Sequence, residues 1–242
     1  MPWWIATLLY AMYWFFEGGA ERVIQICNNR KNGYLLITNS WFVIEIAIFY
    51  MVFFLSFNWC GGDFRKGIIK SLVGVCLFMV LAYAVGLGGW WFYSSLTFVL
   101  GMVWKENETN INQFSEKKWF LFIARWGIIF AFGYAVRFLN SRTVHSPVIY
   151  DLALLISSFG FTGIVFSILK KISINSYLWD FIGRVSFELY LIHELIYNIL
   201  RNEKLGLYVE NDLLYVSLVV FLSVVCAYIF NKMITKKLFH RY

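Results

Sequence analysis

Long apolar runs separated by short polar segments constrain this chain more than any other feature. A helix needs about 20 mostly apolar residues to cross the hydrocarbon core of a bilayer. Applying that length to the sequence gives eight candidate spans, an arrangement that is not typical of a soluble core. We expect the spans at residues 2–16, 40–58, 67–88, 90–104, 119–139, 148–169, 178–200 and 213–231.

Composition supports the bilayer as the solvent of this chain. Hydrophobic residues make up 60% of the sequence and charged residues only 14%, whereas a soluble domain carries about a quarter charged residues. No internal repeat or separate polar domain interrupts the runs. We therefore predict an all-α fold, a polytopic integral membrane helix bundle of about eight transmembrane helices that forms a single domain over residues 1–242, with membrane lipids as its surroundings.

The net charge of +7 is explained by membrane topology. The Lys and Arg residues lie mainly between the apolar runs, and no basic stripe with interleaved aromatics marks a nucleic-acid-binding surface. Cytoplasmic segments of membrane proteins retain basic residues. The basic tail KKLFHRY and the pair Lys170–Lys171 therefore predict a multi-pass protein of the cell membrane with both termini in the cytoplasm and no nucleic-acid partner.

Motifs for several kinds of chemistry are missing from the sequence. The cysteines Cys27, Cys60, Cys76 and Cys226 are widely spaced and form no CxxC pair, so a metal or redox site is not expected. The sequence also lacks a nucleophile elbow, an HExxH motif, a P-loop and a dinucleotide-binding glycine pattern. We expect neither a metal nor a bound cofactor.

Charged side chains inside the predicted spans are the first candidate site residues. Arg125 lies in WFLFIARWGIIF and Glu45 in SWFVIEIAIFY. A charge at bilayer depth costs roughly 2.5 kcal/mol or more, so both residues are expected to face a protein interior or a wet cavity. Two interpretations are open: a salt bridge between two helices, or a role in binding an anionic substrate or handling a proton. Arg184 and Glu188, one helical turn apart, are predicted to form a structural ion pair.

The richest polar pattern lies in DFIGRVSFELYLIHELIYN, residues 180–198. On a helix of about 100° per residue, one face collects Ser186, Tyr190, His193 and Tyr197, with Glu194 at its margin. A histidine beside a carboxylate can serve as an acid or base near neutral pH. A histidine in a membrane helix can also simply hydrogen-bond to a neighbouring helix, and this interpretation stays open as well.

Three segments of the sequence resemble the acyltransferase 3 membrane family. GRVSFELYLIH, residues 183–193, is similar to the signature of a late helix in that family. NSWF, residues 39–42, and WFYSSLTFVLGM, residues 91–102, resemble two further family stretches in the same order and spacing. The resemblance covers roughly residues 39–200.

The resemblance implies a membrane-bound O-acyltransferase. Members of the family move an acyl group, often acetyl from cytosolic acetyl-CoA, onto a sugar hydroxyl of a surface polysaccharide, lipopolysaccharide or peptidoglycan precursor. Acyl-CoA is then the co-substrate, and a glycan or lipid-linked saccharide is the acceptor; the acceptor sugar, the acyl chain and the oligomeric state stay open. The catalytic residues predicted on this basis are His193 and Glu194, and the predicted substrate-binding residues are Arg125, Glu45, Ser186, Tyr190 and Trp41.

One part of the family pattern is missing. The first spans of the family usually carry an Arg or Lys and a His a short distance apart, and no apolar run of this chain offers that pair. The chain is therefore expected to correspond to the C-terminal part of the family domain, either as a truncated and inactive fragment, as a chain whose start was misplaced, or as a divergent form that uses His193 differently. Two other classes also stay open: a transporter or flippase-like protein for an anionic or lipid-linked substrate, and a non-catalytic membrane scaffold.

Overall fold

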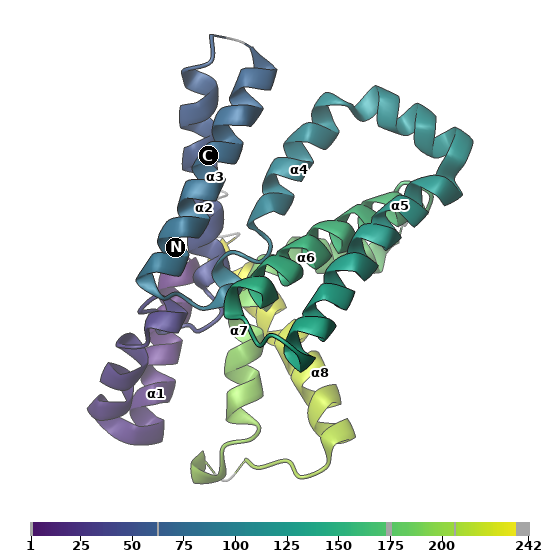
Figure 1. The fold of residues 1–242 in the computed structure, drawn as a ribbon. Coiled ribbons are helices and arrows are strands. Elements are labelled where there is room, and N and C mark those ends of the chain that lie inside the picture. Colours follow the sequence, from purple (N-terminus) through teal and green to yellow (C-terminus); the bar gives the residue numbers. More distant parts are fainter. Residues whose placement is uncertain (1, 62, 173–175, 206, 236–242) are drawn as a thin grey trace. The chain divides into compact units, whose positions relative to one another are not determined.

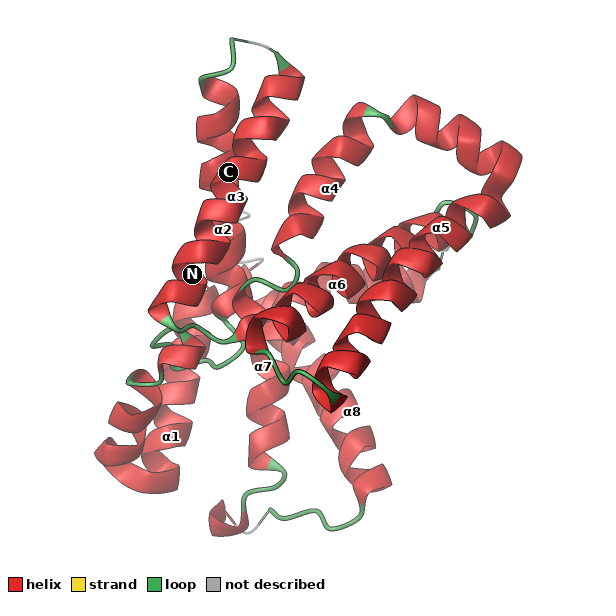
Figure 2. Cartoon of the chain, in the orientation of Figure 1, coloured by secondary structure: helices red, strands yellow, loops and turns green. Residues whose placement is uncertain are grey.

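The computed structural model describes residues 2–61, 63–172, 176–205 and 207–235, and these residues form helices and connecting loops without a strand (Figure 2). The α-helices follow one another in Figure 1 as α1 (Pro2–Cys27), α2 (Trp41–Asn58), α3 (Phe64–Val85), α4 (Ser95–Glu106), α5 (Glu108–Arg142), α6 (Pro147–Leu169), α7 (Tyr177–Ile199) and α8 (Asp212–Phe230). Five of them, α2, α3, α5, α6 and α8, are long and apolar enough to cross a membrane. The prediction of an all-helical, polytopic membrane protein is confirmed.

The chain divides into two compact units. The first unit comprises residues Met1–Trp41 and Asn175–Tyr242, with helices α1, α7 and α8, and the second comprises Phe42–Ile174, with α2 to α6. The prediction of a single domain stays a prediction.

In the first unit, α7 lies between α1 and α8 in its contacts. The buried face of α7 carries Val185 and Leu191, and α8 contributes Ala227, which is fully buried. The hydroxyl of Tyr215 donates to the carbonyl of Tyr197 at 3.0 Å. These contacts hold the polar residues of α7 in a defined register.

Helix α1 extends beyond its predicted span 2–16. The helix is interrupted at Gly18 and at Gly19, whose φ of +69° is in the left-handed region that favours glycine. Helical turns then resume up to Cys27, in a segment expected to be a polar connection. The ammonium group of Lys204 donates to the carbonyl of Glu17 at 2.8 Å, so it satisfies a backbone acceptor freed by the interruption.

In the second unit, α5 and α6 pack along a row of small buried residues on α6: Ala153, Ser157, Gly160, Gly163 and Ser167. A Cβ atom on Gly160 would lie only 2.5 Å from the backbone nitrogen of Phe130. Small side chains at such positions let membrane helices approach closely and gain dispersion contacts.

Helix α5 begins at Glu108, within the polar segment between the predicted spans 90–104 and 119–139. The backbone leaves helical geometry at Lys118 and then continues as the predicted span. The ring of Phe114 lies 6.0 Å from that of Phe122 across this bend. Packing of this kind stabilises a polar helical segment that hydropathy alone assigns to a loop.

The predicted span 90–104 is wrong in its first residues. Helix α3 ends at Val85 and is capped by Gly86, whose φ is +79°. Residues Gly89–Trp91 then form a 3₁₀ turn before α4 begins at Ser95. Helix α4 has 12 residues, which corresponds to a length of about 18 Å. Since the hydrocarbon core is about 30 Å thick, α4 cannot cross it alone.

Candidate functional site

The polar face of α7 meets the segment that precedes α2, within the first unit. The hydroxyl of Tyr190 donates to the backbone carbonyl of Asn39. The side-chain amide nitrogen of Asn39 lies 3.4 Å from Nε2 of His193. Two of the predicted residues thus contact one short segment that is 151 and 154 residues away in the sequence.

The backbone determines which nitrogen of His193 carries hydrogen in the neutral ring. Nδ1 lies 2.8 Å from the carbonyl oxygen of Tyr190 and 3.2 Å from that of Leu189. Both oxygens are acceptors only, so Nδ1 must be the donor. Nε2 then has a free lone pair, which the amide of Asn39 approaches. It is the only atom of the neutral ring that can accept a proton.

Glu194 reaches the same segment. Its Oε1 accepts a hydrogen bond from the hydroxyl of Thr38. Its Oε2 is buried and has no hydrogen-bond partner among the residues that the structure describes. A buried polar atom without a partner costs about 1–3 kcal/mol. The carboxylate therefore offers an acceptor to a ligand at an energetic cost to the fold.

The remaining residues of the α7 stripe do not join this cluster. Ser186 is exposed, and its hydroxyl donates to the carbonyl of Gly183 in its own helix at 2.9 Å. Tyr197 is exposed on the last turns of the helix. Trp41 is half-buried at the start of α2. The predicted stripe is present on α7, and the hydrogen bonds described above between it and the segment before α2 come from its central turn.

Arg184 and Glu188, which are predicted to form an ion pair on α7, each contact a further residue. The guanidinium carbon of Arg184 lies 5.9 Å from the ring centre of Tyr177. Glu188 is buried, and one of its oxygens accepts a hydrogen bond from the amide of Asn231 at 2.9 Å. Glu188 thus joins α7 to the end of α8.

Glu45 and Arg125 belong to the second unit. Glu45 is 2% exposed, and its Oε1 accepts a hydrogen bond from the fully buried hydroxyl of Ser95 at 2.8 Å. Oε2 of Glu45 is a second buried carboxylate oxygen without a hydrogen-bond partner in the described part of the chain. Glu45 therefore faces the protein interior, one of the two surroundings expected for it.

Arg125, in contrast to Glu45, has an exposed side chain. Its guanidinium carbon lies 4.9 Å from the ring centre of Phe114, and it lines a cavity of about 460 Å³ on α5. The bend at Lys118 lies between these two residues, and a long arginine stem lets the charged head contact an aromatic face while staying outside the helix packing. The structure thus gives Glu45 a hydroxyl and Arg125 an aromatic ring as partners, in place of a salt bridge between them.

Sequence reasoning missed Thr38 and the role of the Asn39 side chain. The sequence signal was present, because the polar run Thr38–Asn39–Ser40 stands directly before an apolar span. Nothing in a single sequence connects that run to α7. The residues of α7 that contact it through Thr38 and Asn39 lie 156 and 154 positions further along the chain.

Comparison with known proteins gives a family match for this chain. A family model described as an acyltransferase domain, that of acyltransferase 3, matches residues 1–232. The chain belongs to the acyltransferase 3 family. The resemblance noted over residues 39–200 is therefore confirmed and extends over nearly all of the sequence. No curated protein and no solved structure matches the chain.

In this acyltransferase 3 protein, the cluster on α7 has groups suited to acyl transfer. Moving an acyl group to a hydroxyl needs a base for the hydroxyl proton, and a neutral imidazole nitrogen with a free lone pair can provide it. The roles of His193 and Glu194 as catalytic residues stay predictions. Among the described residues, His, Cys, Asp and Glu form no group that could hold a metal ion.

Proposed function

We propose that this acyltransferase 3 protein transfers an acyl group, in the first place acetyl, from acyl-CoA to a hydroxyl of a cell-surface polysaccharide or glycolipid. The observation that carries the proposal is the orientation of His193, with Nδ1 directed at two backbone carbonyls and Nε2 left as an acceptor. The proposed location is the cell membrane, with both termini in the cytoplasm, where acyl-CoA is available.

The proposed reaction is a direct transfer. The acceptor hydroxyl displaces the amide of Asn39 and hydrogen-bonds to Nε2 of His193, which takes its proton as the oxygen attacks the thioester carbonyl. The new C–O bond forms, the C–S bond breaks, and the departing sulfur receives the proton back from Nε2 as the CoA thiol. The ring ends in its starting state, so no external reductant or second proton source is needed.

Glu194 is proposed to bind the acceptor. Its Oε2 lacks a hydrogen-bond partner within the described chain, and a carboxylate oxygen accepts readily from a sugar hydroxyl. Arg125, Glu45, Ser186, Tyr190 and Trp41 are proposed as further substrate-binding residues; the cation of Arg125 suits an anionic group of either substrate. The glycan acceptor and the acyl-CoA donor are the proposed partners.

The experiment compares two histidine variants of the same type. Membranes that contain the protein are incubated with radiolabelled acetyl-CoA, and label is measured in the glycan fraction. His193→Asn is expected to lower the rate by about 10²- to 10⁴-fold, the usual contribution of a general base. His145→Asn is the matched control, because His145 is exposed in a loop with φ of 54°, which asparagine adopts readily. Equal labelling by both variants, at equal protein abundance, would contradict the proposal.

A further inference from the structure

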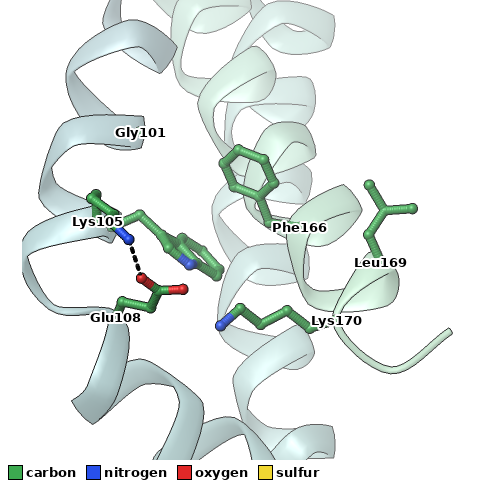
Figure 3. A pocket seen from close by; sticks show the side chains of 7 residues that line it. Gly101, Lys105, Glu108, Phe166, Leu169 and Lys170 are labelled. Atoms are coloured by element: carbon green, nitrogen blue, oxygen red, sulfur yellow. Dashed lines mark hydrogen bonds and ion pairs between the residues drawn. The ribbon is translucent and has the colours of Figure 1, made fainter. Parts of the chain in front are cut away.

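Two cavities in the second unit meet at Lys170, directly after the end of α6. The first has a volume of about 350 Å³, and the residues that line it include Trp104, Lys105, Glu108, Phe166 and Lys170 (Figure 3). The second has a volume of about 430 Å³, and its walls include Asn112, Glu116, Trp119, Lys170 and Lys171. Lys170 belongs to both, so a single ligand can contact both cavities.

Each cavity places a lysine ammonium group against a tryptophan ring. The Nζ atom of Lys170 lies 5.8 Å from the ring centre of Trp104, and that of Lys171 lies 4.3 Å from the ring centre of Trp119. Trp104 is only 9% exposed, and the indole nitrogen of Trp119 donates to the carbonyl of Ser167 at 3.0 Å. Both rings are therefore fixed walls, and the ammonium groups above them keep donors for an anion.

The third lysine differs from these two. Lys105 donates to Glu108 at 2.7 Å, as Figure 3 shows. This hydrogen bond raises the pKa of Lys105. Since Glu108 offsets the charge of Lys105, the positive charge available to a ligand comes from Lys170 and Lys171.

The position of the lysine pair along α6 indicates the depth of the site. Helix α6 is apolar enough to cross a membrane and ends at Leu169, directly before Lys170. Leu169 is 51% exposed at the edge of the first cavity, and Phe166 lines its wall. Basic residues at the end of a span lie at the level of the lipid phosphates, and basic pockets between membrane helices bind anionic headgroups. An apolar rim beside such a pocket suits the first carbons of the acyl chains.

The second cavity adds an acceptor beside the cations. The side-chain oxygen of Asn112 is buried and has no hydrogen-bond partner within the described ranges. The carboxylate of Glu116 lines the same cavity. These oxygens suit a hydroxyl donor, whereas the ammonium groups of Lys170 and Lys171 suit a phosphate.

We infer that the two cavities that meet at Lys170 bind the headgroup of an anionic phospholipid that carries hydroxyls, with its phosphate between Lys170 and Lys171 and a hydroxyl donating to Asn112. A phosphatidylglycerol headgroup has this combination of groups. Lipid binding at these cavities does not depend on the proposed acyl transfer.

The test measures lipid binding by the purified full chain. The delipidated protein is placed in phosphatidylcholine nanodiscs, and bound phosphatidylglycerol is quantified by native mass spectrometry as its fraction is raised. The double variant Lys170→Gln, Lys171→Gln is expected to bind phosphatidylglycerol roughly tenfold or more weakly, since each basic residue near the surface contributes about 1 kcal/mol. The double variant Lys117→Gln, Lys118→Gln is the matched control, because it removes the same charge from an adjacent pair that lines neither cavity.

Two further arms make the result specific. The double variant Lys170→Arg, Lys171→Arg keeps the charge and is expected to keep binding. If replacing the two lysines simply misfolded the protein, lipid binding would be lost in this Arg variant as well as in the Gln variant. Asn112→Leu is expected to weaken phosphatidylglycerol binding but not phosphatidic acid binding, because phosphatidic acid lacks the headgroup hydroxyls. Equal phosphatidylglycerol binding by the Gln variant and its control would overturn the inference. Displacement of the lipid by soluble adenosine 3′,5′-diphosphate would also overturn it, because the phosphate would then come from a nucleotide.

Discussion

The side-chain amide nitrogen of Asn39 lies 3.4 Å from Nε2 of His193, although the two residues are 154 positions apart. The amide covers the only atom of the neutral ring that can accept a proton, because Nδ1 points at the carbonyls of Leu189 and Tyr190. A contact of 3.4 Å is long for a hydrogen bond, so an incoming hydroxyl can replace the amide at little cost. Asn39 thus covers the lone pair of Nε2 in the free protein. Because its amide is a donor, it also favours the form of the ring in which Nε2 carries no hydrogen.

Replacement of Asn39 by Asp tests this relationship. A carboxylate only accepts hydrogen bonds, so it draws hydrogen onto Nε2 and removes the lone pair that the reaction needs. We expect Asn39→Asp to lower the rate of acetyl transfer by about 10²-fold or more, with little change in unfolding temperature. Asn39→Ser keeps a donor at the position and is expected to retain measurable transfer. Radiolabel incorporation and thermal unfolding in detergent measure the two effects, and an active Asp variant would refute the assignment of Nε2 as the base.

Thr38 is expected to contribute to stability through Glu194. Its hydroxyl donates to Oε1, and Oε2 already lacks a partner in the described residues. Thr38→Val keeps the shape but leaves the whole carboxylate without that donor, so the free energy of unfolding should fall by about 1–3 kcal/mol. Thr38→Ser should restore most of it. Denaturation of the purified protein measures the difference; equal stability of the Val and Ser variants would show that the hydroxyl is not needed.

Ser95 and Glu45 are expected to be coupled. Ser95→Ala removes the hydrogen bond to Oε1 and leaves a buried carboxylate without it, so it should be the more destabilising single change. Glu45→Gln removes the carboxylate and should leave stability unchanged or higher. A double-mutant cycle should therefore give an interaction energy of about 0.5–3 kcal/mol. Additive effects of the two substitutions on unfolding temperature would show that the pair is not coupled.

Gly160 is expected to set the distance between α5 and α6. A Cβ atom at this position would lie 2.5 Å from the backbone nitrogen of Phe130, which cannot move without shifting the helix. Gly160→Ala should therefore destabilise the second unit by about 1–3 kcal/mol. Gly127→Ala is the matched control, since a Cβ atom there would have no contact within 4 Å. The thermal unfolding of both variants is compared, and a Gly160→Ala protein as stable as the control would mean that the helices separate easily.

The sequence predicts the starts of the later helices well, because their apolar runs begin shortly after residues that can cap the N-terminus of a helix. Helix α6 begins after Ser146, whose side chain accepts from a backbone N–H, with Pro147 at its first turn. Helices α7 and α8 begin after Ser176 and Asn211, which cap their helices in the same way. The start of each of these helices lies within one residue of its predicted position.

The failures have a common physical reason. The first part of α5 is polar and has the composition of a loop, but the packing of Phe114 on Phe122 is a tertiary contact that hydropathy does not contain. The site shows the same limit. The stripe with Tyr190 and His193 follows from helical periodicity alone, whereas its contacts with Thr38 and Asn39 join distant segments. A single sequence predicts which residues share a face of a helix, and not what lies opposite.

The shortness of α4 limits the height between Phe42, at the start of α2, and Lys105, near the end of α4. Helices α2 and α4 run in the same direction (Figure 1), and the hydrogen bond between Glu45 and Ser95 places these two residues at one depth. From there, ten residues of helix separate Ser95 from Lys105, or about 15 Å, and three separate Glu45 from Phe42, or about 4.5 Å. The levels of Phe42 and Lys105 are therefore at most about 20 Å apart, about two thirds of the hydrocarbon thickness. A group that moved between the levels of Phe42 and Lys105 would travel a shorter distance than one that crossed the full hydrocarbon thickness.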